Sequence, residues 1–386
     1  MKTHAVAVGE EPDSAGSLYH VVEDLLARAD IHIGGERPCD LRRLSPQVPA
    51  RVLGRGSLGL GESYMDGQWD ANRLDAFFAR LLRAGLDQQV RPWRLLWHGL
   101  RARLVNRQTR RRAGQVAAVH YDLGNDFYQA MLDRRLTYTC GYWRHAGSLD
   151  DAQEAKLELV CRKLDLQPGQ RVLDIGCGWG SFARFAAERY GVSVVGLNIS
   201  REQVELGRQL CQGLPVELRL QDYRDIDQRF DHIVSLGMFE HVGRRNYRTY
   251  LRVAHRCLEP GGLFLLHTIG KNQTNSAPDP WMDKYIFPNG DLPSLRQITA
   301  AAEGLFLVED MHNFGADYDR TLMAWYDNFR RAWPRFRERY GPRFFRMWEY
   351  YLLSCAGAFR ARDIQLWQLV LARQGEGVTG GYRRPE

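Results

Sequence analysis

No stretch of this sequence is apolar for long enough to cross a membrane. The 386 residues contain no run that reaches the roughly 18 apolar residues of a transmembrane helix. The first thirty residues also lack the continuous apolar segment of a signal peptide. We therefore expect a protein that is soluble or peripheral to a membrane and is not exported. Its length allows a sizeable core and predicts two domains.

The sequence also lacks the paired cysteines and the C-x-x-C spacing of zinc sites. Its seven cysteines are odd in number and scattered: Cys39, Cys140, Cys161, Cys177, Cys211, Cys257 and Cys355. This pattern predicts reduced thiols in a cytoplasm and argues against a structural zinc site, so we expect no metal.

Acidic residues are missing from segment 91–112, which carries eight arginines and contributes to the net charge of +7. Apolar residues in this segment recur at the spacing of one helical face, namely Trp93, Leu96, Trp97, Leu100 and Leu104. Three interpretations fit: an inter-domain helix with solvated arginines, a helix on an anionic membrane surface, or a nucleic-acid contact. We place the domain boundary near 110–118, which divides the chain into 1–112 and 113–386.

The most informative feature that is present is the run 172–180, VLDIGCGWG, where a buried strand turns into a glycine-rich bend. Glycine lacks Cβ, so such a bend lets a ligand lie against backbone N–H groups at the start of a helix. Position 181 is Ser, so the dinucleotide fingerprint G-x-G-x-x-G is not met. The G-x-G-x-G spacing after Asp174 favours an S-adenosylmethionine pocket of the class I methyltransferase kind, although a glycine-rich turn alone is often only a tight turn.

Downstream of this bend, strand-like and helix-like segments alternate. The strand-like runs are 192–199, 216–222, 232–238 and 261–269, and the helix-like segments lie near 201–212 and 244–258. This rhythm predicts an α/β fold with a doubly wound, Rossmann-like parallel sheet. After an insertion at 271–293, the runs 304–311 and 364–372 predict a closing antiparallel pair. Amphipathic helices near 18–29 and 74–86 predict a small, mainly helical N-terminal domain.

From about Leu53 to Arg373, the chain resembles the cyclopropane-fatty-acyl-phospholipid synthases. The blocks that carry this resemblance include GSLGLGESYMDG (56–67), HYDLGNDFY (120–128), LDIGCGWG (173–180), LQDYRDI (220–226), GMFEHVG (237–243), KYIFPNG (284–290), NFGADYD (313–319) and CAGAFRARDIQLWQ (355–368). The resemblance implies transfer of a methylene group from S-adenosylmethionine to the cis double bond of acyl chains in a phospholipid bilayer. It also implies a homodimer at the inner face of the membrane and no nucleic-acid partner.

Position along the strands predicts the residues that contact the cofactor, because open α/β sheets bind ligands at the carboxyl ends of their strands. Asn198 stands where related sites often have an acidic residue and the resembling enzymes have threonine, so Gln203 is the better candidate for the ribose. The full set is Tyr138, Thr139, Val172, Leu173, Asp174, Gly176, Cys177, Gly178, Trp179, Gly180, Asn198, Ile199, Ser200, Gln203, Gln221, Asp222 and Tyr223. Asp222 has an alternative interpretation as the cap of the following turn.

Ring formation on an alkene requires a base, because methyl transfer leaves a carbocation that closes only when the added methyl group loses a proton. The resemblance implies that this base is a bicarbonate ion held by Cys140, Glu240, His267, the backbone at Ile269 and Tyr318. Taken singly, a histidine at a strand end is more often a structural hydrogen-bonding group, and a cysteine after threonine is more often part of a core.

Cys355 matches a family position traditionally proposed as a nucleophile, but it lies in the apolar run 350–359, and methylation of an alkene needs no covalent intermediate. Trp281, Tyr285 and Phe287 are candidates for the walls of an acyl channel or for ordinary core. Two other functions remain open from the residues. The first is a methyltransferase acting on RNA or a small amine, and the second is a non-catalytic lipid-binding module.

Overall fold

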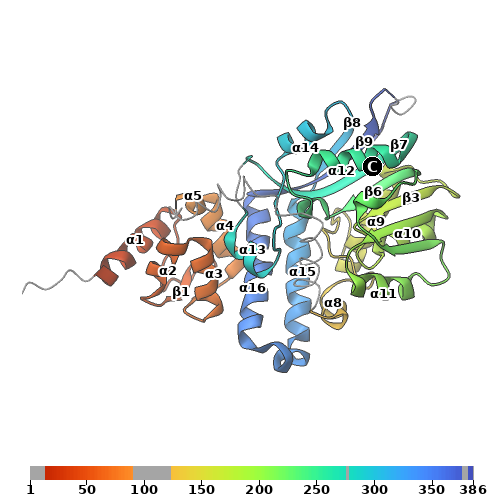
Figure 1. The fold of residues 1–386 in the computed structure, drawn as a ribbon. Helices are drawn as coiled ribbons and strands as arrows, with labels where there is room; N and C mark the ends of the chain where they lie inside the picture. The colour runs from red at the N-terminus through yellow and green to blue at the C-terminus, as the bar shows by residue number, and fades with distance from the viewer. Residues whose placement is uncertain (1–13, 90–122, 275–277, 376–380, 386) are drawn as a thin grey trace, which may run out of the picture.

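The structure is a computed structural model that describes residues 14–89, 123–274, 278–375 and 381–385. Figure 1 shows a helical N-terminal unit on one side, a large β-sheet on the other, and two long helices between them. The N-terminal unit contains α1 (Ser14–Arg28), β1 (Leu41–Leu44), α2 (Val48–Arg55), α3 (Ser57–Met65), β2 (Trp69–Ala71), α4 (Leu74–Arg83) and α5 (Leu86–Gln89). The predicted N-terminal helices are confirmed as α1 and α4. Segment 91–112 and the predicted boundary lie outside the described residues, so the division into 1–112 and 113–386 stays a prediction.

The large sheet has seven strands in the order β5-β4-β3-β6-β7-β9-β8. Their bounds are β3 (Arg171–Ile175), β4 (Ser193–Asn198), β5 (Val216–Leu220), β6 (Phe230–Leu236), β7 (Leu258–Lys271), β8 (Phe306–Asn313) and β9 (Ile364–Arg373). Neighbours are parallel from β5 through β7, whereas β9 lies between β7 and β8 and is antiparallel to both. The predicted doubly wound sheet and its closing antiparallel pair are confirmed.

Both faces of this sheet are covered, which explains why its strands read as nearly continuous apolar runs. Adjacent residues of a strand point to opposite faces. Val172 accordingly packs with one buried cluster and Leu173 with another. The first cluster includes residues of α9 (Leu149–Lys163), α10 (Ser181–Tyr190) and α11 (Arg201–Leu210), and the second includes residues of α12 (Tyr247–Cys257) and α14 (Leu295–Ala302).

Two long helices, α15 (Ala316–Ala332) and α16 (Arg337–Ala361), pack side by side between the sheet and the N-terminal unit (Figure 1). Short α8 (Asn125–Met131) packs on α15, and α13 (Pro280–Tyr285), within the predicted insertion, packs on α3. Within the described ranges, none of the helices combines the length and the apolar character that crossing a bilayer requires.

The N-terminal unit joins the rest of the chain at a close contact between α4 and α16. A Cβ atom added at Gly357 would lie 2.6 Å from the Cβ of Phe78 and 2.8 Å from the carbonyl oxygen of Asp75. Arg360, one turn further along α16, donates to the carboxylates of both Asp75 and Asp319. The two helices therefore approach at a distance that only glycine permits at position 357.

We predict that Gly357→Ala destabilises the protein by about 1–3 kcal/mol, because the added methyl group must push α4 away from α16. Gly54 in α2 is the matched control, since a Cβ there meets no atom within 4 Å in the part of the chain that the structure describes. Gly54→Ala should be neutral or stabilising by up to about 1 kcal/mol, because alanine favours a helix. Urea unfolding midpoints measure both effects, and equal midpoints for the two variants would contradict this packing.

Candidate active site

The glycine-rich bend follows β3 directly and has the backbone that its composition predicts. Gly176, Gly178 and Gly180 have φ values of 87°, 55° and 79°, in the left-handed region where a side chain is strained. A Cβ at Gly176 would lie 2.6 Å from the side chain of Met238, whereas one at Gly178 would meet no atom of the described residues within 4 Å. The bend therefore packs closely on one side and is open at Gly178.

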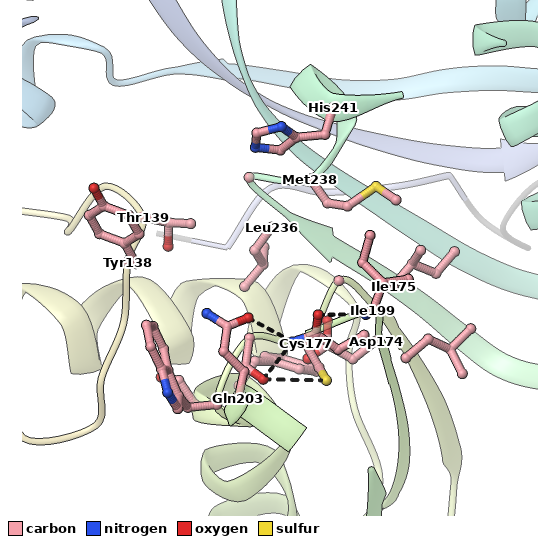
Figure 2. Close-up of a pocket in the computed structure, with 18 of the residues that line it drawn as sticks. Tyr138, Thr139, Asp174, Ile175, Cys177, Ile199, Gln203, Leu236, Met238 and His241 are labelled. Carbon is pink, nitrogen blue, oxygen red and sulfur yellow. Dashed lines mark hydrogen bonds between the residues drawn. The ribbon is translucent and has the colours of Figure 1, made fainter. Parts of the chain in front are cut away.

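A pocket with a volume of about 190 Å³ lies at the carboxyl ends of β3, β4 and β6. Figure 2 shows Met238 and His241 at one side of it and Gln203 at the opposite side. The predicted cofactor residues that line it are Tyr138, Thr139, Asp174, Gly176, Cys177, Gly178, Trp179, Asn198, Ile199, Gln203, Gln221, Asp222 and Tyr223. Most of the predicted set therefore meets at one cavity.

Four predicted cofactor residues lie outside the lining of this pocket. Val172 and Leu173 are fully buried in the two faces of the sheet. A Cβ at Gly180 would lie 3.1 Å from the side chains of Cys211 and Leu218, which places it against α11 and β5. Ser200 caps α11, because its hydroxyl accepts from the backbone of Gln203. These four residues shape the pocket by supporting the elements around it.

Asn198 and Gln203 are both candidates for contact with the ribose, and the structure gives them different roles. Asn198 Nδ2 donates to the carbonyl oxygen of Gly178 at 3.0 Å and to Gln203 Oε1 at 2.8 Å. Its Oδ1 accepts from the backbone N–H groups of Ile199 and Ser200. Asn198 therefore holds the bend and the β4 turn in place. Gln203 uses its oxygen on Asn198, so only its NH₂ end is left to donate to a ribose hydroxyl.

Asp222 combines the two roles considered for it, because it lines the pocket and also caps a turn. Its carboxylate accepts from the backbone N–H of Arg224 at 2.9 Å, which caps the short helix η1 (Tyr223–Asp225). The Arg224 guanidinium also donates to it, at 2.8 and 2.6 Å. The carboxylate therefore lies beside the pocket in an orientation that Arg224 holds.

Two polar residues of α9 support the pocket, although the sequence analysis did not predict them. Lys156 is fully buried and donates to the hydroxyl of Thr139 at 2.7 Å, and Gln153 donates to the carbonyl oxygen of Thr139 at 2.7 Å. Burial lowers the pKa of Lys156 to about 8 and raises the pKa of neighbouring Asp174 to about 7. The sequence pattern that could have indicated this role is a glutamine and a lysine three residues apart on the apolar face of a helix.

A second group of polar side chains, formed by Cys140, Glu240, His267 and Tyr318, lies beside this pocket. In the chain, Cys140 follows Thr139 and Glu240 follows Met238 by two residues, and both Thr139 and Met238 line the pocket. Glu240, in the short helix η2 (Phe239–His241), accepts from the backbone N–H of Ile269 at 2.7 Å. His267 precedes Ile269 by two residues and so lies on the same face of β7. Burial raises the pKa of Tyr318 well above its usual value, and nearby Cys140 and Glu240 raise it further. The structure thus brings Cys140, Glu240 and Tyr318 together beside the backbone of Ile269, and His267 lies two residues before Ile269 on β7.

Buried polar atoms in this second group lack partners. Neither Glu240 Oε2 nor His267 Nε2 has a hydrogen-bond partner among the described residues, although both atoms are inaccessible to solvent. Burial raises the pKa of Glu240 to about 7 and lowers the pKa of His267 well below its usual value. It also raises the pKa of the Cys140 thiol well above its usual value. Unpaired buried polar groups are costly, so these atoms fit contacts to a small polar ligand.

Cys355 and the aromatic residues of the insertion are not among the residues that line the cofactor pocket. Burial raises the pKa of the Cys355 thiol to about 12, which makes it a poor nucleophile. Trp281 is fully buried against Tyr350, with ring centroids 4.4 Å apart, and it therefore belongs to a core contact. Phe287 lies closer to the site, 5.7 Å from the ring of His241. The hydroxyl of Tyr285 donates to Glu62 on α3 at 3.0 Å.

Comparison with known proteins identifies relatives of this arrangement. Residues 108–369 match the family described as Mycolic acid cyclopropane synthetase. The chain is 55% identical over 366 residues to cyclopropane-fatty-acyl-phospholipid synthase of Escherichia coli strain K12, with 95% of each chain covered. The structure of the cyclopropane synthase MmaA2 from Mycobacterium tuberculosis is similar with a TM-score of 0.64 and 30% identity, covering 67% of this chain and 98% of that one.

A mycolic acid cyclopropane synthase, CmaA1, solved in complex with SAH and CTAB, is similar with a TM-score of 0.63 and 32% identity. The alignment covers 68% of this chain and 98% of that one. These likenesses confirm the predicted class I methyltransferase fold and the resemblance found in the sequence motifs. They also support S-adenosylmethionine as the cofactor of the pocket.

We predict that Gly178→Val abolishes measurable binding of S-adenosylmethionine, because the new side chain would extend from a strained backbone into the pocket. Gly213 is the matched control: its φ is also positive and none of the described residues lies within 4 Å of its Cβ position, but it does not line the pocket. Gly213→Val should bind the cofactor normally. Isothermal calorimetry measures both, and unchanged affinity in Gly178→Val would overturn the pocket assignment.

Proposed function

The chain belongs to the cyclopropane-fatty-acyl-phospholipid synthase family of S-adenosylmethionine-dependent methyltransferases, and on that premise we propose that it forms cyclopropane rings at cis double bonds of phospholipid acyl chains. The observation that carries this proposal is the second polar group beside the cofactor pocket. A methyltransferase acting on RNA or an amine needs no base for the transferred methyl group. Here Glu240 Oε2 and His267 Nε2 are buried and unpaired among the described residues.

The reaction needs two things from the protein besides the methyl donor. An alkene is a weak nucleophile, so the double bond must be held in line with the sulfonium methyl group in a dry pocket. The bond from sulfur to methyl carbon breaks as a bond to one alkene carbon forms, which leaves a cation on the other alkene carbon. Loss of a proton from the added methyl group then supplies the electron pair that closes the ring.

Bicarbonate fits the second polar group as the proposed base. Cys140, Glu240, His267, Tyr318 and the backbone at Ile269 would hold it. Raised pKa values keep Cys140 and Tyr318 neutral, so neither brings a competing negative charge, and the Tyr318 hydroxyl can donate a hydrogen bond to an anion. When bound, bicarbonate would supply the group that takes up the proton.

The residues around this site also exclude water, which would trap the cation as an alcohol. Cys140 and His267 are 0% and 1% exposed, and the ring of Tyr318 stacks on Phe359 with centroids 4.5 Å apart. Such aromatic faces stabilise a nearby cation, since the ring face carries negative charge. A buried, neutral and partly aromatic environment therefore suits a cationic intermediate.

We extend the proposal to the partners of the enzyme: a phospholipid bilayer, reached from the cytoplasmic side, and a second copy of the chain. Contacts between the N-terminal unit and the insertion support the lipid part. Glu62 of α3 accepts from Lys284 at 2.7 Å and from Tyr285 at 3.0 Å, both on α13. Phe287 follows α13 and lies beside His241 of the pocket. The N-terminal unit is thus tied to the segment that flanks the site, where an acyl chain would enter.

The fate of an isotopic label tests the reaction. We expect that S-adenosylmethionine with a fully deuterated methyl group yields lipid retaining two deuterium atoms at the new carbon, because ring closure removes the third. A methyltransferase acting on oxygen, nitrogen or nucleic acid would retain all three, since its nucleophile loses the proton. Mass spectrometry of lipid from phospholipid vesicles, with RNA and amines as parallel substrates, separates these outcomes. A lipid product with three deuterium atoms would exclude cyclopropane formation.

Substitution of the second polar group tests the site. We expect Glu240→Gln and His267→Ala each to lower turnover by about 10²–10⁴-fold, the range typical of losing positioned proton-transfer groups. Cofactor affinity should be unchanged, because neither residue lines the cofactor pocket. Glu23→Gln and His20→Ala on the exposed face of α1 are matched controls and should have normal turnover. Near-normal turnover in both site variants would refute this role.

A further inference from the structure

A line of buried polar side chains leads from the edge of the sheet to His267. Lys163, at the end of α9, lies 3.5 Å from Asp310 Oδ2 and 2.9 Å from Gln368 Oε1. Gln368 Nε2 in turn lies 3.2 Å from His267 Nδ1. Lys163 and Gln368 are 0% exposed and His267 is 1% exposed. Nothing in the proposed chemistry uses Lys163 or Gln368, yet burying a lysine and a glutamine is costly unless they are paired.

The strand register places these groups in one row. Gln368 of β9 pairs with His267 of β7 on one side and with His312 of β8 on the other. Lys163 covers this row from α9, and its ammonium group also lies 3.1 Å from His312 Nδ1. Asp310 of β8 partly compensates the lysine charge. Gln368 is therefore held between a cation and an imidazole.

Hydrogen-bond polarity fixes the orientation of the Gln368 amide. An ammonium group has donors and no acceptor, so the group facing Lys163 must be the amide oxygen. The NH₂ end of the amide then faces His267 Nδ1, which must accept. In a neutral imidazole one nitrogen accepts and the other carries the hydrogen, so the hydrogen of His267 resides on Nε2.

We propose that Lys163 and Gln368 are positioning residues that hold His267 in the Nε2–H tautomer, so that the ring presents a hydrogen-bond donor toward the anion site. This inference rests on the proposed function for the role of His267 toward bicarbonate, whereas the tautomer itself rests only on the contacts above. Burial, with Lys156 and Lys163 nearby, lowers the pKa of His267, which keeps the ring neutral. His267 then binds the base as a donor and does not itself remove the proton.

The alternative tautomer would place two donors against each other. With hydrogen on Nδ1, the imidazole N–H would face the NH₂ group of Gln368 at 3.2 Å, and both would be buried without an acceptor. Reversing the amide would only move the conflict to Lys163. In the Nε2–H form only that N–H lacks a partner among the described residues, whereas the Nδ1–H form leaves two facing donors unpaired. Each additional buried donor without a partner disfavours a state roughly 10- to 100-fold, so the Nε2–H form should dominate.

The tautomer can be measured directly in the full chain by NMR of ¹⁵N-labelled histidine, with the His267 signals identified by their loss in His267→Gln. We expect hydrogen on Nε2 in the unsubstituted protein. In Gln368→Glu, both carboxylate oxygens accept, so the hydrogen should move to Nδ1. In Gln368→Met, which removes the hydrogen bond with little change in volume, both tautomers should appear. Gln365→Met is the matched control on β9, because Gln365 contacts Asn272, Asn313 and Arg362 and not His267.

Turnover provides the second measurement. With bicarbonate added to carbonate-free buffer, the concentration for half-maximal turnover should rise roughly 10- to 100-fold in Gln368→Glu, because the ring would present a lone pair to an anion. The KM for S-adenosylmethionine should stay unchanged, and Gln365→Met should behave normally. Hydrogen on Nδ1 in the unsubstituted protein, or an unchanged tautomer in both folded Gln368 variants, overturns the inference. Turnover that is independent of bicarbonate, with hydrogen on Nε2, supports the positioning pair and instead overturns the proposed base.

Discussion

The pairing of β9 with both β7 and β8 is the constraint on which the polar half of the site depends. This strand runs antiparallel between them, so Gln368 lies opposite His267 across one boundary and opposite His312 across the other. A slip of one residue would turn Gln368 to the other face of the sheet and leave His267 without its partner. The chain passes through α15 and α16 before it forms β9. Tyr318 of α15 and Cys355 of α16 lie near each other beside the site.

Removal of water determines the charge of almost every group in the site. Burial is the largest influence on the pKa values of Cys140, Glu240, His267 and Tyr318, and in each case it favours the neutral form. A thiolate or a phenolate would capture a carbocation. Cys140 and Tyr318 stay neutral, so neither would compete for it in this way. The same desolvation leaves unpaired polar atoms that a small anion can satisfy.

Sequence reasoning succeeded where a residue type is required locally and failed where a contact depends on register. The three glycines of the bend could be predicted, because a tight turn against a ligand requires positive φ. The alternation of strands and helices followed from apolar periodicity. By contrast, the contact between Lys163 and Gln368 joins residues 205 positions apart, and no local pattern encodes it. The role of Asn198 in holding the bend depends likewise on where β3 and β4 place their ends.

The turn at Thr139 and Cys140 shows how the fold separates the two halves of the chemistry. Gln153 and Lys156 of α9 hold Thr139 by its carbonyl oxygen and its hydroxyl, so that Thr139 faces the cofactor pocket. The next residue, Cys140, is fully buried beside Thr321 and belongs to the other polar group. One peptide unit thus separates the wall that faces the methyl donor from the wall that would face the base. Because the same carbon must first leave sulfur and then lose a proton, the proposed reaction requires these two walls to be this close.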